Sequence, residues 1–462
     1  MTAARAAARG SAMRTIKPQF HGGVYLPSEK DQTLDAAVAV LPDPGFVLVP
    51  MRQHEGAAAV PCVLPGRRVL AGEPLGLAGA DDSAAVHSPV SGKVCSLENV
   101  RLPDGGRCVA AAVESDGANQ WAEHVNVSQD PADFTPANFA ERFAALGLVQ
   151  MQPRGQPLHR RIQLARDASV DTLVVNAMES EPYLTADHRL TVEQSLLVAL
   201  GTAHLCRLIG AERGVVAVDH RRNEEAELLD GLLTEHGAEL KLDLGAVCLD
   251  HLYPQGHELM LLKTLFDQEV EVRAGDAGGE RATDRAGVCV LDISAVAAAA
   301  DAMLFNRPLV HRVVTVSGDA VARPGNLFVP IGVRIADVLA HAGAAAVVDR
   351  LIVGGPMTGI AQPDDQSVLT KQSAGLVAFA AAMLHQPGPC IRCGWCVEDC
   401  PVGINPALLA DAAEAQRPDR RARSTAHLCI ECNICSYVCP ARLPLRERIG
   451  LLKRAAWRKG SL

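Results

Sequence analysis

The apolar residues of this chain change their spacing along its length, and these changes divide it into segments. From residue 14 to about 134, short runs of Val, Leu and Ala such as 44–51 are separated by Gly and Pro, which predicts an all-β module with tight turns. Over 135–310, buried strand-like runs such as 170–180 alternate with helical periods such as 191–210. This alternation predicts a doubly wound α/β domain with a ligand site beyond the carboxyl ends of its parallel strands.

The rest of the chain reads as two smaller modules and two terminal segments. Residues 311–373 show strand, turn, strand and helix, and then a strand entering a Gly-rich turn, which predicts a small β-grasp module and a polar linker. Residues 374–445 hold most of the cysteines, and 446–462 form a basic tail. Residues 1–13 lack the apolar region of a secretory signal, and we expect them to be disordered.

Eight of the fourteen cysteines form two copies of the pattern C-x2-C-x2-C-x3-C-P. This is the spacing of two-cluster bacterial ferredoxins, in which three cysteines bind one [4Fe-4S] cluster and the fourth, before Pro, binds the other. Zinc knuckles and disulfides are the alternatives, but zinc sites usually show separated C-x2-C pairs. We therefore predict one cluster on Cys390, Cys393, Cys396 and Cys439, and a second on Cys429, Cys432, Cys435 and Cys400.

Charge and composition narrow the class of protein. The net charge of −9 gives no electrostatic support to a nucleic-acid role. The other six cysteines are scattered singly, which is typical of buried thiols in a reducing cytoplasm. The longest uncharged apolar stretch, 374–384, is far short of the roughly 20 residues of a membrane-spanning helix. We expect a protein that is soluble or peripheral on a membrane.

Two local features each allow two interpretations. The run 86–94 resembles the hairpin of lipoyl-like barrel-sandwich domains, but Lys93 lacks the Met-Lys-Met context of a swinging arm, which favours a purely structural hairpin. In the C-terminal segment 441–462, apolar residues follow a helical stripe beside seven Lys or Arg. This helix either docks on an anionic bilayer or packs back on the cysteine domain, and its thin apolar face favours packing. We also expect Trp395, Ile391, Ile430 and Ile434 to shield the clusters from water.

Several segments together resemble one family, the RnfC subunits of Rnf complexes. The Rnf complex is an ion-translocating NADH–ferredoxin oxidoreductase, and its RnfC subunit is related to the flavin-carrying, NADH-binding subunit of respiratory complex I. The matching stretches, in addition to the cysteine motifs, are 20–30, 170–190, 252–259, 312–318, 329–335 and 352–359. The resemblance implies that NADH reduces FMN in the α/β domain and that FMN passes single electrons to the clusters. It also implies a peripheral place on the cytoplasmic face of the inner membrane, with membrane subunits and NADH or ferredoxin as partners.

The chain departs from the family where FMN is expected. Only Gly155 and Pro157 match the glycine-rich FMN loop, where Gln150, Gln152 and Pro153 replace glycines. Pro153 also removes a backbone donor, although Arg154 could hold a phosphate by its charge. Two further departures are Gly256-His257-Glu258-Leu259, which loses a cation, and Asp292-Ile293-Ser294-Ala295, whose Asp would repel a phosphate.

Glu179, Glu181, Tyr183 and Asp187 remain in the matching segment 170–190. In one interpretation the carboxylates bind ribose or flavin hydroxyls and Tyr183 stacks on the ring. In the other they cap a helix that begins near Thr185–Asp187. FMN therefore stays an open prediction, with Arg154, Gly155, Glu179, Glu181 and Tyr183 as its candidate residues.

Three functions remain after these observations. The favoured one is an electron-transfer subunit of an Rnf-type translocase that relays electrons through two [4Fe-4S] clusters, with its own NADH and FMN catalysis left open. The second is a non-catalytic iron–sulfur adapter whose flavin site is disabled. The third is a soluble flavoprotein of the kind that reduces corrinoids, which shares the same order of modules.

Overall fold

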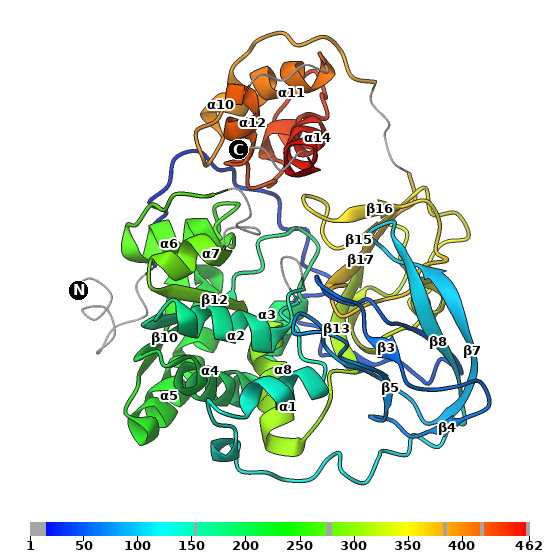
Figure 1. Cartoon of the computed structure of the whole chain (residues 1–462). Coiled ribbons are helices and arrows are strands. Elements are labelled where there is room, and N and C mark those ends of the chain that lie inside the picture. Colours follow the sequence, from blue (N-terminus) through cyan, green and yellow to red (C-terminus); the bar gives the residue numbers. More distant parts are fainter. Residues whose placement is uncertain (1–14, 152–154, 274–279, 382–385, 416–419, 459–462) are drawn as a thin grey trace.

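The computed structural model describes residues 15–151, 155–273, 280–381, 386–415 and 420–458. Over these residues, four β-sheets and their helices form three modules, and a fourth, helical module follows them (Figure 1). The C-terminal helices, orange to red in Figure 1, lie above the α/β domain and the sheet that contains β15, and the blue N-terminal segment passes between them. The predicted multidomain α/β architecture is confirmed.

The N-terminal β module contains two antiparallel sheets, of order β2-β8-β7-β4 and β3-β5-β6. Val47, Leu75 and Val113 are fully buried in the core between them. Lys93 is exposed within a paired strand, opposite Arg68 and Glu114, which agrees with a structural hairpin and not a swinging arm. The strands are β2 (Phe46–Pro50), β3 (Val60–Pro61), β4 (Arg68–Val69), β5 (Pro74–Leu77), β6 (Val86–His87), β7 (Gly92–Arg101) and β8 (Arg107–Ser115).

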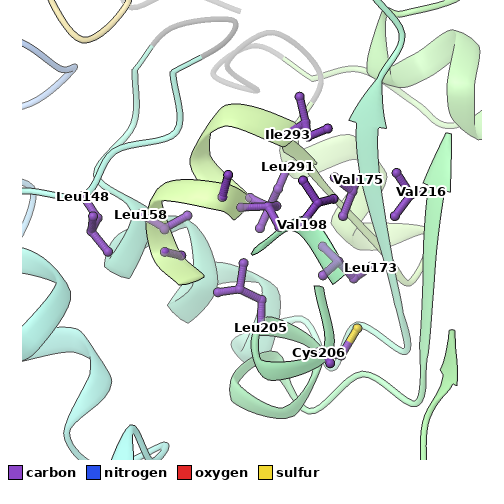
Figure 2. Packing of buried hydrophobic residues seen from close by; sticks show 14 of the residues in the cluster. Leu148, Leu158, Leu173, Val175, Val198, Leu205, Cys206, Val216, Leu291 and Ile293 are labelled. Carbon is purple, nitrogen blue, oxygen red and sulfur yellow. The ribbon is translucent and has the colours of Figure 1, made fainter. Parts of the chain in front are cut away.

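The α/β domain has a parallel sheet of order β11-β10-β9-β12, formed by β9 (Thr172–Ala177), β10 (Arg213–Asp219), β11 (Asp243–Leu249) and β12 (Val288–Asp292). Leu173 and Leu291 of this sheet pack against Leu205 on a neighbouring helix (Figure 2). Its α-helices are α1 (Phe139–Ala145), α2 (Leu158–Asp167), α3 (Ala186–Glu193), α4 (Ser195–Ile209), α5 (Asn223–Leu240), α6 (Glu258–Phe266), α7 (Glu280–Arg285) and α8 (Ile293–Phe305). Two 3-10 turns, η1 (Pro131–Asp133) and η2 (His220–Arg222), complete it.

The helical period at 191–210 corresponds to two helices and not one. Helix α3 ends at Glu193, and α4 begins at Ser195. Helix α4 packs closely on α8 at Gly201, which has no side chain to keep the two backbones apart. A Cβ at this position would lie 2.4 Å from the Val296 carbonyl oxygen. The Ala-rich helix α8 thereby lies against the core, and its first residue follows directly on the carboxyl end of β12.

The third module is a six-stranded mixed sheet of order β1-β14-β13-β17-β15-β16. It includes β1 from the start of the chain, parallel to β14, and β17, which lies beyond residue 373 where we expected the module to end. Its elements are β1 (Ala39–Val40), β13 (His311–Ser317), β14 (Gly325–Pro330), α9 (Ile335–His341), β15 (Arg350–Val353), β16 (Ile360–Gln362) and β17 (Gly375–Phe379).

The cysteine-rich module consists of five helices, α10 (Trp395–Glu398), α11 (Pro406–Glu414), α12 (Arg420–Ala426), α13 (Ile434–Tyr437) and α14 (Leu445–Arg458). Ile449 and Leu452 of α14 are buried against Ile404 and Leu409 of this module. The apolar stripe of the tail thus packs on the module, while the side chain of Trp457 lies outside the described residues. Among the residues that the structure describes, no helix has both the length and the apolar character needed to cross a membrane.

Candidate functional site

A cavity of about 470 Å³ lies where the sequence places the ligand site, at the carboxyl ends of strands β9 and β12. All four modules contribute to its wall: residues 52–54 from the β module, 176–181 from the α/β domain, 353–355 from the third module and 427–432 from the cysteine module. Because four modules form this wall, a ligand bound in the cavity would lie beside the cysteine motifs. This position suits a part in electron transfer.

Glu179 and Asp187 line this cavity side by side. The Glu179 carboxylate accepts hydrogen bonds from the backbone N–H groups of Asp187 and His188, both at 3.2 Å, and so caps helix α3. Burial raises the pKa of the Glu179 carboxyl to about 7, opposed by the charge of Lys30 and reinforced by Asp187. Asp187 accepts a hydrogen bond from Ser294 Oγ at 2.9 Å. Glu179 therefore caps α3, as one of the two interpretations of the sequence expects, and also faces the cavity.

Glu181 connects the α/β domain to the third module. Its carboxylate accepts hydrogen bonds from the backbone N–H groups of Met357 at 2.9 Å and Thr358 at 2.8 Å, and from the Thr358 hydroxyl. Burial raises the pKa of Glu181, and these hydrogen bonds oppose the rise. The Gly-rich turn after β15 is thus held at the cavity wall by a carboxylate from the segment 170–190.

The structure does not bring all the predicted FMN residues together. Tyr183 is absent from the described residues that line the cavity, and its ring packs edge to face on Phe379 with 5.5 Å between centroids. Gly155 has a positive φ of 72° and packs so closely on Gln372 that a Cβ would lie 2.0 Å from its side chain. Arg154 lies outside the described residues.

Asp292 stands at the N-terminus of α8, where an anion would otherwise be favoured by the helix dipole. Its carboxylate accepts hydrogen bonds from the backbone N–H of Ala295 at 2.9 Å and of Met151 at 2.8 Å. A carboxylate of the protein therefore already holds these two donors, and this end of the cavity does not fit a phosphate. The sequence predicted repulsion by Asp292; the structure adds that the side chain also takes the hydrogen bonds.

The structure brings each fourth cysteine to the opposite triplet. Burial raises the pKa of the Cys396 thiol, and the nearby thiols of Cys393, Cys439 and Cys390 raise it further. In the other set, burial raises the pKa of the Cys435 thiol, and Cys429, Cys432 and Cys400 add to the rise. A small cavity of about 20 Å³ lies among this second set, bordered by apolar side chains such as Ile404, Ile434 and Ile449. Four thiols around a dry space are the donor set that a [4Fe-4S] cluster requires.

The two cysteine sets differ in their surroundings. Cys429 and Cys432 belong to the wall of the large cavity, and the Tyr253 hydroxyl donates a hydrogen bond to the Cys432 carbonyl oxygen at 2.7 Å. Cys390 and Cys393 are exposed. Ile391 and Trp395 beside them are 65% and 52% exposed, so they do not shield the first set from water as we expected.

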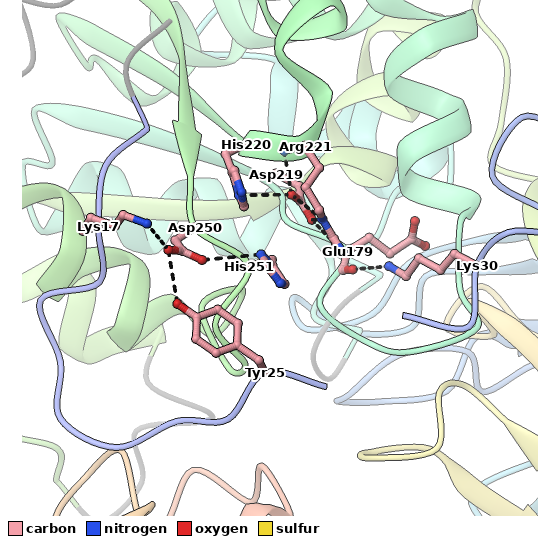
Figure 3. A network of polar contacts seen from close by, with 9 residues as sticks. All are labelled: Lys17, Tyr25, Lys30, Glu179, Asp219, His220, Arg221, Asp250 and His251. Atoms are coloured by element: carbon pink, nitrogen blue, oxygen red, sulfur yellow. Dashed lines mark hydrogen bonds and ion pairs between the residues drawn. The ribbon is translucent and has the colours of Figure 1, made fainter. Parts of the chain in front are cut away.

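A polar network lies behind the cavity, at the ends of β10 and β11 (Figure 3). Asp219, His220 and His251 have ligand atoms within 4.8 Å of one another, a set that can hold a metal ion. However, Arg221 forms a salt bridge to the Asp219 carboxylate at 2.5 Å and opposes a cation there. Its members lie at the ends of two different strands, so no single stretch of the sequence contains the set.

Family models match consecutive parts of the chain. They are the RnfC barrel sandwich hybrid domain at residues 18–118, the Nuo51 FMN-binding domain at 144–300, the SLBB domain at 313–361 and the 4Fe-4S dicluster domain at 389–444. The cysteine motifs thus belong to a 4Fe-4S dicluster domain, as predicted.

Three relatives, each the C subunit of its complex, extend this match over most of the chain. The relative from the ion-translocating oxidoreductase complex of Rhodobacter capsulatus is 32% identical, over 84% of this chain and 74% of that protein. The one from the proton-translocating ferredoxin:NAD(+) oxidoreductase complex of Clostridium ljungdahlii is 30% identical, over 85% and 83%. The one from the Na(+)-translocating ferredoxin:NAD(+) oxidoreductase complex of Acetobacterium woodii is 30% identical, over 87% and 88%. The chain belongs to the RnfC family, the C subunits of Rnf-type ion-translocating oxidoreductase complexes.

Proposed function

We propose that this chain relays electrons through two [4Fe-4S] clusters within an Rnf-type complex. The observation that carries the proposal is the exchange of the fourth cysteine: Cys439 lies with the first triplet, and Cys400 with the second. This exchange suits two cubane clusters on one small helical module, whereas independent zinc knuckles would each keep their own four ligands. When bound, the clusters supply one-electron chemistry.

The two cysteine sets lie in different surroundings, and we assign them to the inner and the outer end of the electron relay. The Cys429 set borders the large cavity and is held to the α/β domain through Tyr253, so it forms the inner end. The Cys390 set opens to the surface beside Ile391 and Trp395, which makes it the outer end, where another electron-carrying subunit docks. Relatives named as ferredoxin:NAD(+) oxidoreductase subunits make ferredoxin and the NAD(+)/NADH pair the expected ultimate electron-exchange partners.

The chain's place in the complex follows from its charge and helices. A net charge of −9 leaves nucleic acid without an electrostatic attraction. The tail helix uses its apolar face on its own module, which leaves membrane attachment to the partner subunits. We infer a peripheral position on the cytoplasmic face of the inner membrane, in contact with those subunits.

The test is iron analysis combined with matched cysteine substitutions. The anaerobically purified chain should hold about eight irons and eight acid-labile sulfides, because each cubane carries four of each. Cys400→Ala should alter the same electron paramagnetic resonance (EPR) signal as Cys432→Ala, and Cys439→Ala the same signal as Cys393→Ala. The buried, scattered Cys206→Ala is the control and should leave both signals intact.

Two results would contradict the proposal. One is about four irons or fewer per chain, which would exclude two cubane clusters. The other is an effect of Cys400→Ala on the signal that depends on Cys393, since this would assign each motif its own cluster.

A further inference from the structure

The wall of the large cavity carries more acidic than basic side chains. Among its described lining residues, seven have carboxyl groups: Asp104, Glu179, Glu181, Asp187, Glu258, Asp292 and Glu431. Three have permanent cations: Arg52, Arg446 and Lys453. Two of these cations are engaged within the wall, Arg52 with Asp104 at 2.9 Å and Lys453 with Glu431 at 2.9 Å. A phosphate ester at the start of α8 would bring its negative charge close to the Asp292 carboxylate, and the buried Arg312 nearby is already shared between Asp187 and Asp292.

Several backbone donors near the start of α8 are bonded within the protein. Met151 and Ala295 donate their N–H groups to Asp292, as described above. The Gln150 N–H donates to the Gln156 carbonyl at 2.7 Å, and the Leu158 N–H donates to the Leu148 carbonyl at 3.0 Å. A phosphate needs several free N–H groups at a helix N-terminus or a glycine-rich loop. Four described donors of the loop and of the neighbouring helix ends, those of Gln150, Met151, Leu158 and Ala295, are thus taken by the chain itself.

The cavity wall offers hydrogen-bond acceptors to a ligand that carries no phosphate. Glu179 and Asp187 are acceptors that face the cavity, and hydroxyl or ring N–H groups of a neutral ligand can donate to them. The cavity also borders Cys429 and Cys432, so a redox-active ligand would lie beside a cluster. Its volume of about 470 Å³ lies within the usual range of roughly 300–1,000 Å³ for small-molecule sites.

We propose that this cavity binds a flavin that carries no phosphate ester, and that Asp292 is the residue that discriminates against FMN. Asp292 places a carboxylate at the N-terminus of α8 and takes two N–H donors that a phosphate bound there would need. The proposal rests on the electron relay proposed above, because it concerns what lies at the inner end of that relay.

The test compares riboflavin and FMN, which differ only in the phosphate. Binding to the cluster-loaded chain is measured anaerobically by quenching of flavin fluorescence. Riboflavin should bind at least about tenfold more tightly than FMN, because like charges in a buried site are costly. Asp292→Asn keeps an oxygen to cap α8 and removes the charge. This variant should strengthen FMN binding about tenfold and change riboflavin binding less than about twofold.

Asp301→Asn is the matched control, since Asp301 lies on the same helix, pairs with Arg307 and does not line the cavity. It should leave the preference for riboflavin unchanged. The proposal is overturned if the unaltered chain binds FMN as tightly as riboflavin, if Asp292→Asn leaves the preference unchanged, or if neither flavin binds at millimolar concentration. Iron content measured on the same samples separates this failure from that of the relay, because about eight irons would still support the two clusters.

Discussion

Lys371 is a buried cation whose cost to the fold should depend on pH. Its Nζ donates hydrogen bonds to the carbonyl oxygens of Gly147 at 2.7 Å and Ala85 at 3.2 Å, and the side chain is 1% exposed. Burial lowers the pKa of Lys371 from 10.5 to about 7. The unfolded chain thus binds one more proton than the folded chain between these two values, and stability from this group should rise with pH across that window.

The magnitude follows from the width of the window. Each pH unit between about 7 and 10.5 should add about 1.4 kcal/mol to the free energy of unfolding, and the full window about 5 kcal/mol, an upper bound. Lys371→Met removes this dependence. The variant also leaves the two carbonyl oxygens without the ammonium, at a cost of about 1–3 kcal/mol each that does not depend on pH.

The assay is urea unfolding of the unaltered chain and of Lys371→Met at pH 7, 8 and 9, followed by circular dichroism. Other titrating groups are common to both proteins, so the difference in unfolding free energy isolates Lys371. The free energy of unfolding of the unaltered chain, measured relative to that of Lys371→Met, should rise by about 1.4 kcal/mol per pH unit. Lys93→Met alters an exposed position on β7, and its unfolding free energy should change with pH in the same way as that of the unaltered chain. If the unfolding free energies of Lys371→Met and the unaltered chain change equally with pH, a lowered pKa for Lys371 is refuted.

Two further substitutions test contacts between modules, and a third tests the core of the cysteine module. Gly22→Ala should detach the N-terminal segment from the cysteine module and speed its proteolysis, because a Cβ would lie 2.6 Å from the Asp399 carbonyl oxygen at a φ of +68°. Tyr253→Phe should speed iron release to a chelator, because it removes the hydrogen bond to Cys432. Ile449→Ala should destabilise the cysteine module by about 2–5 kcal/mol in thermal unfolding, because Ile449 is fully buried.

Each of these has a matched control. Gly105→Ala shares a positive φ but meets nothing within 4 Å, so its proteolysis should not change. Tyr437→Phe and Leu451→Ala alter exposed side chains of the same module and should leave iron release and unfolding nearly unchanged. Equal effects of a test variant and its control would show that the contact named for that variant does not stabilise the structure.

The features that could be predicted from the sequence are those that short stretches of chain determine by themselves. The cysteine spacing indicated a two-cluster domain, since short loops between ligands set which thiols can meet one cluster. The apolar run at 172–177 predicted a central strand, because a parallel strand is covered on both faces. Helix α8 was missed: its Ala residues give a weak periodic contrast, and close contact with Gly201 decides its burial.

Contacts between distant segments were beyond the reach of these patterns. β1 joins the sheet of the third module across almost 290 residues, and neither strand shows this pairing in its own sequence. Glu181 was assigned to a ligand or a cap, but its carboxylate holds the turn at Met357 and Thr358. Such a role depends on the arrangement of two modules, which single-segment patterns do not contain.

The α/β domain shows why a match to a family model and the chemistry of a site must be argued separately. Residues 144–300 match an FMN-binding domain because strands and helices of that fold depend on many apolar positions. Phosphate binding depends on a few donors, and here Asp292 holds two of them with a buried carboxylate. Losing those donors leaves the apolar core and the cavity intact, so the fold can persist while the ligand changes. The cysteine module carries all eight cysteines of its two motifs, and Cys429 and Cys432 border that cavity, so electron transfer to the proposed clusters does not require that the flavin carry a phosphate.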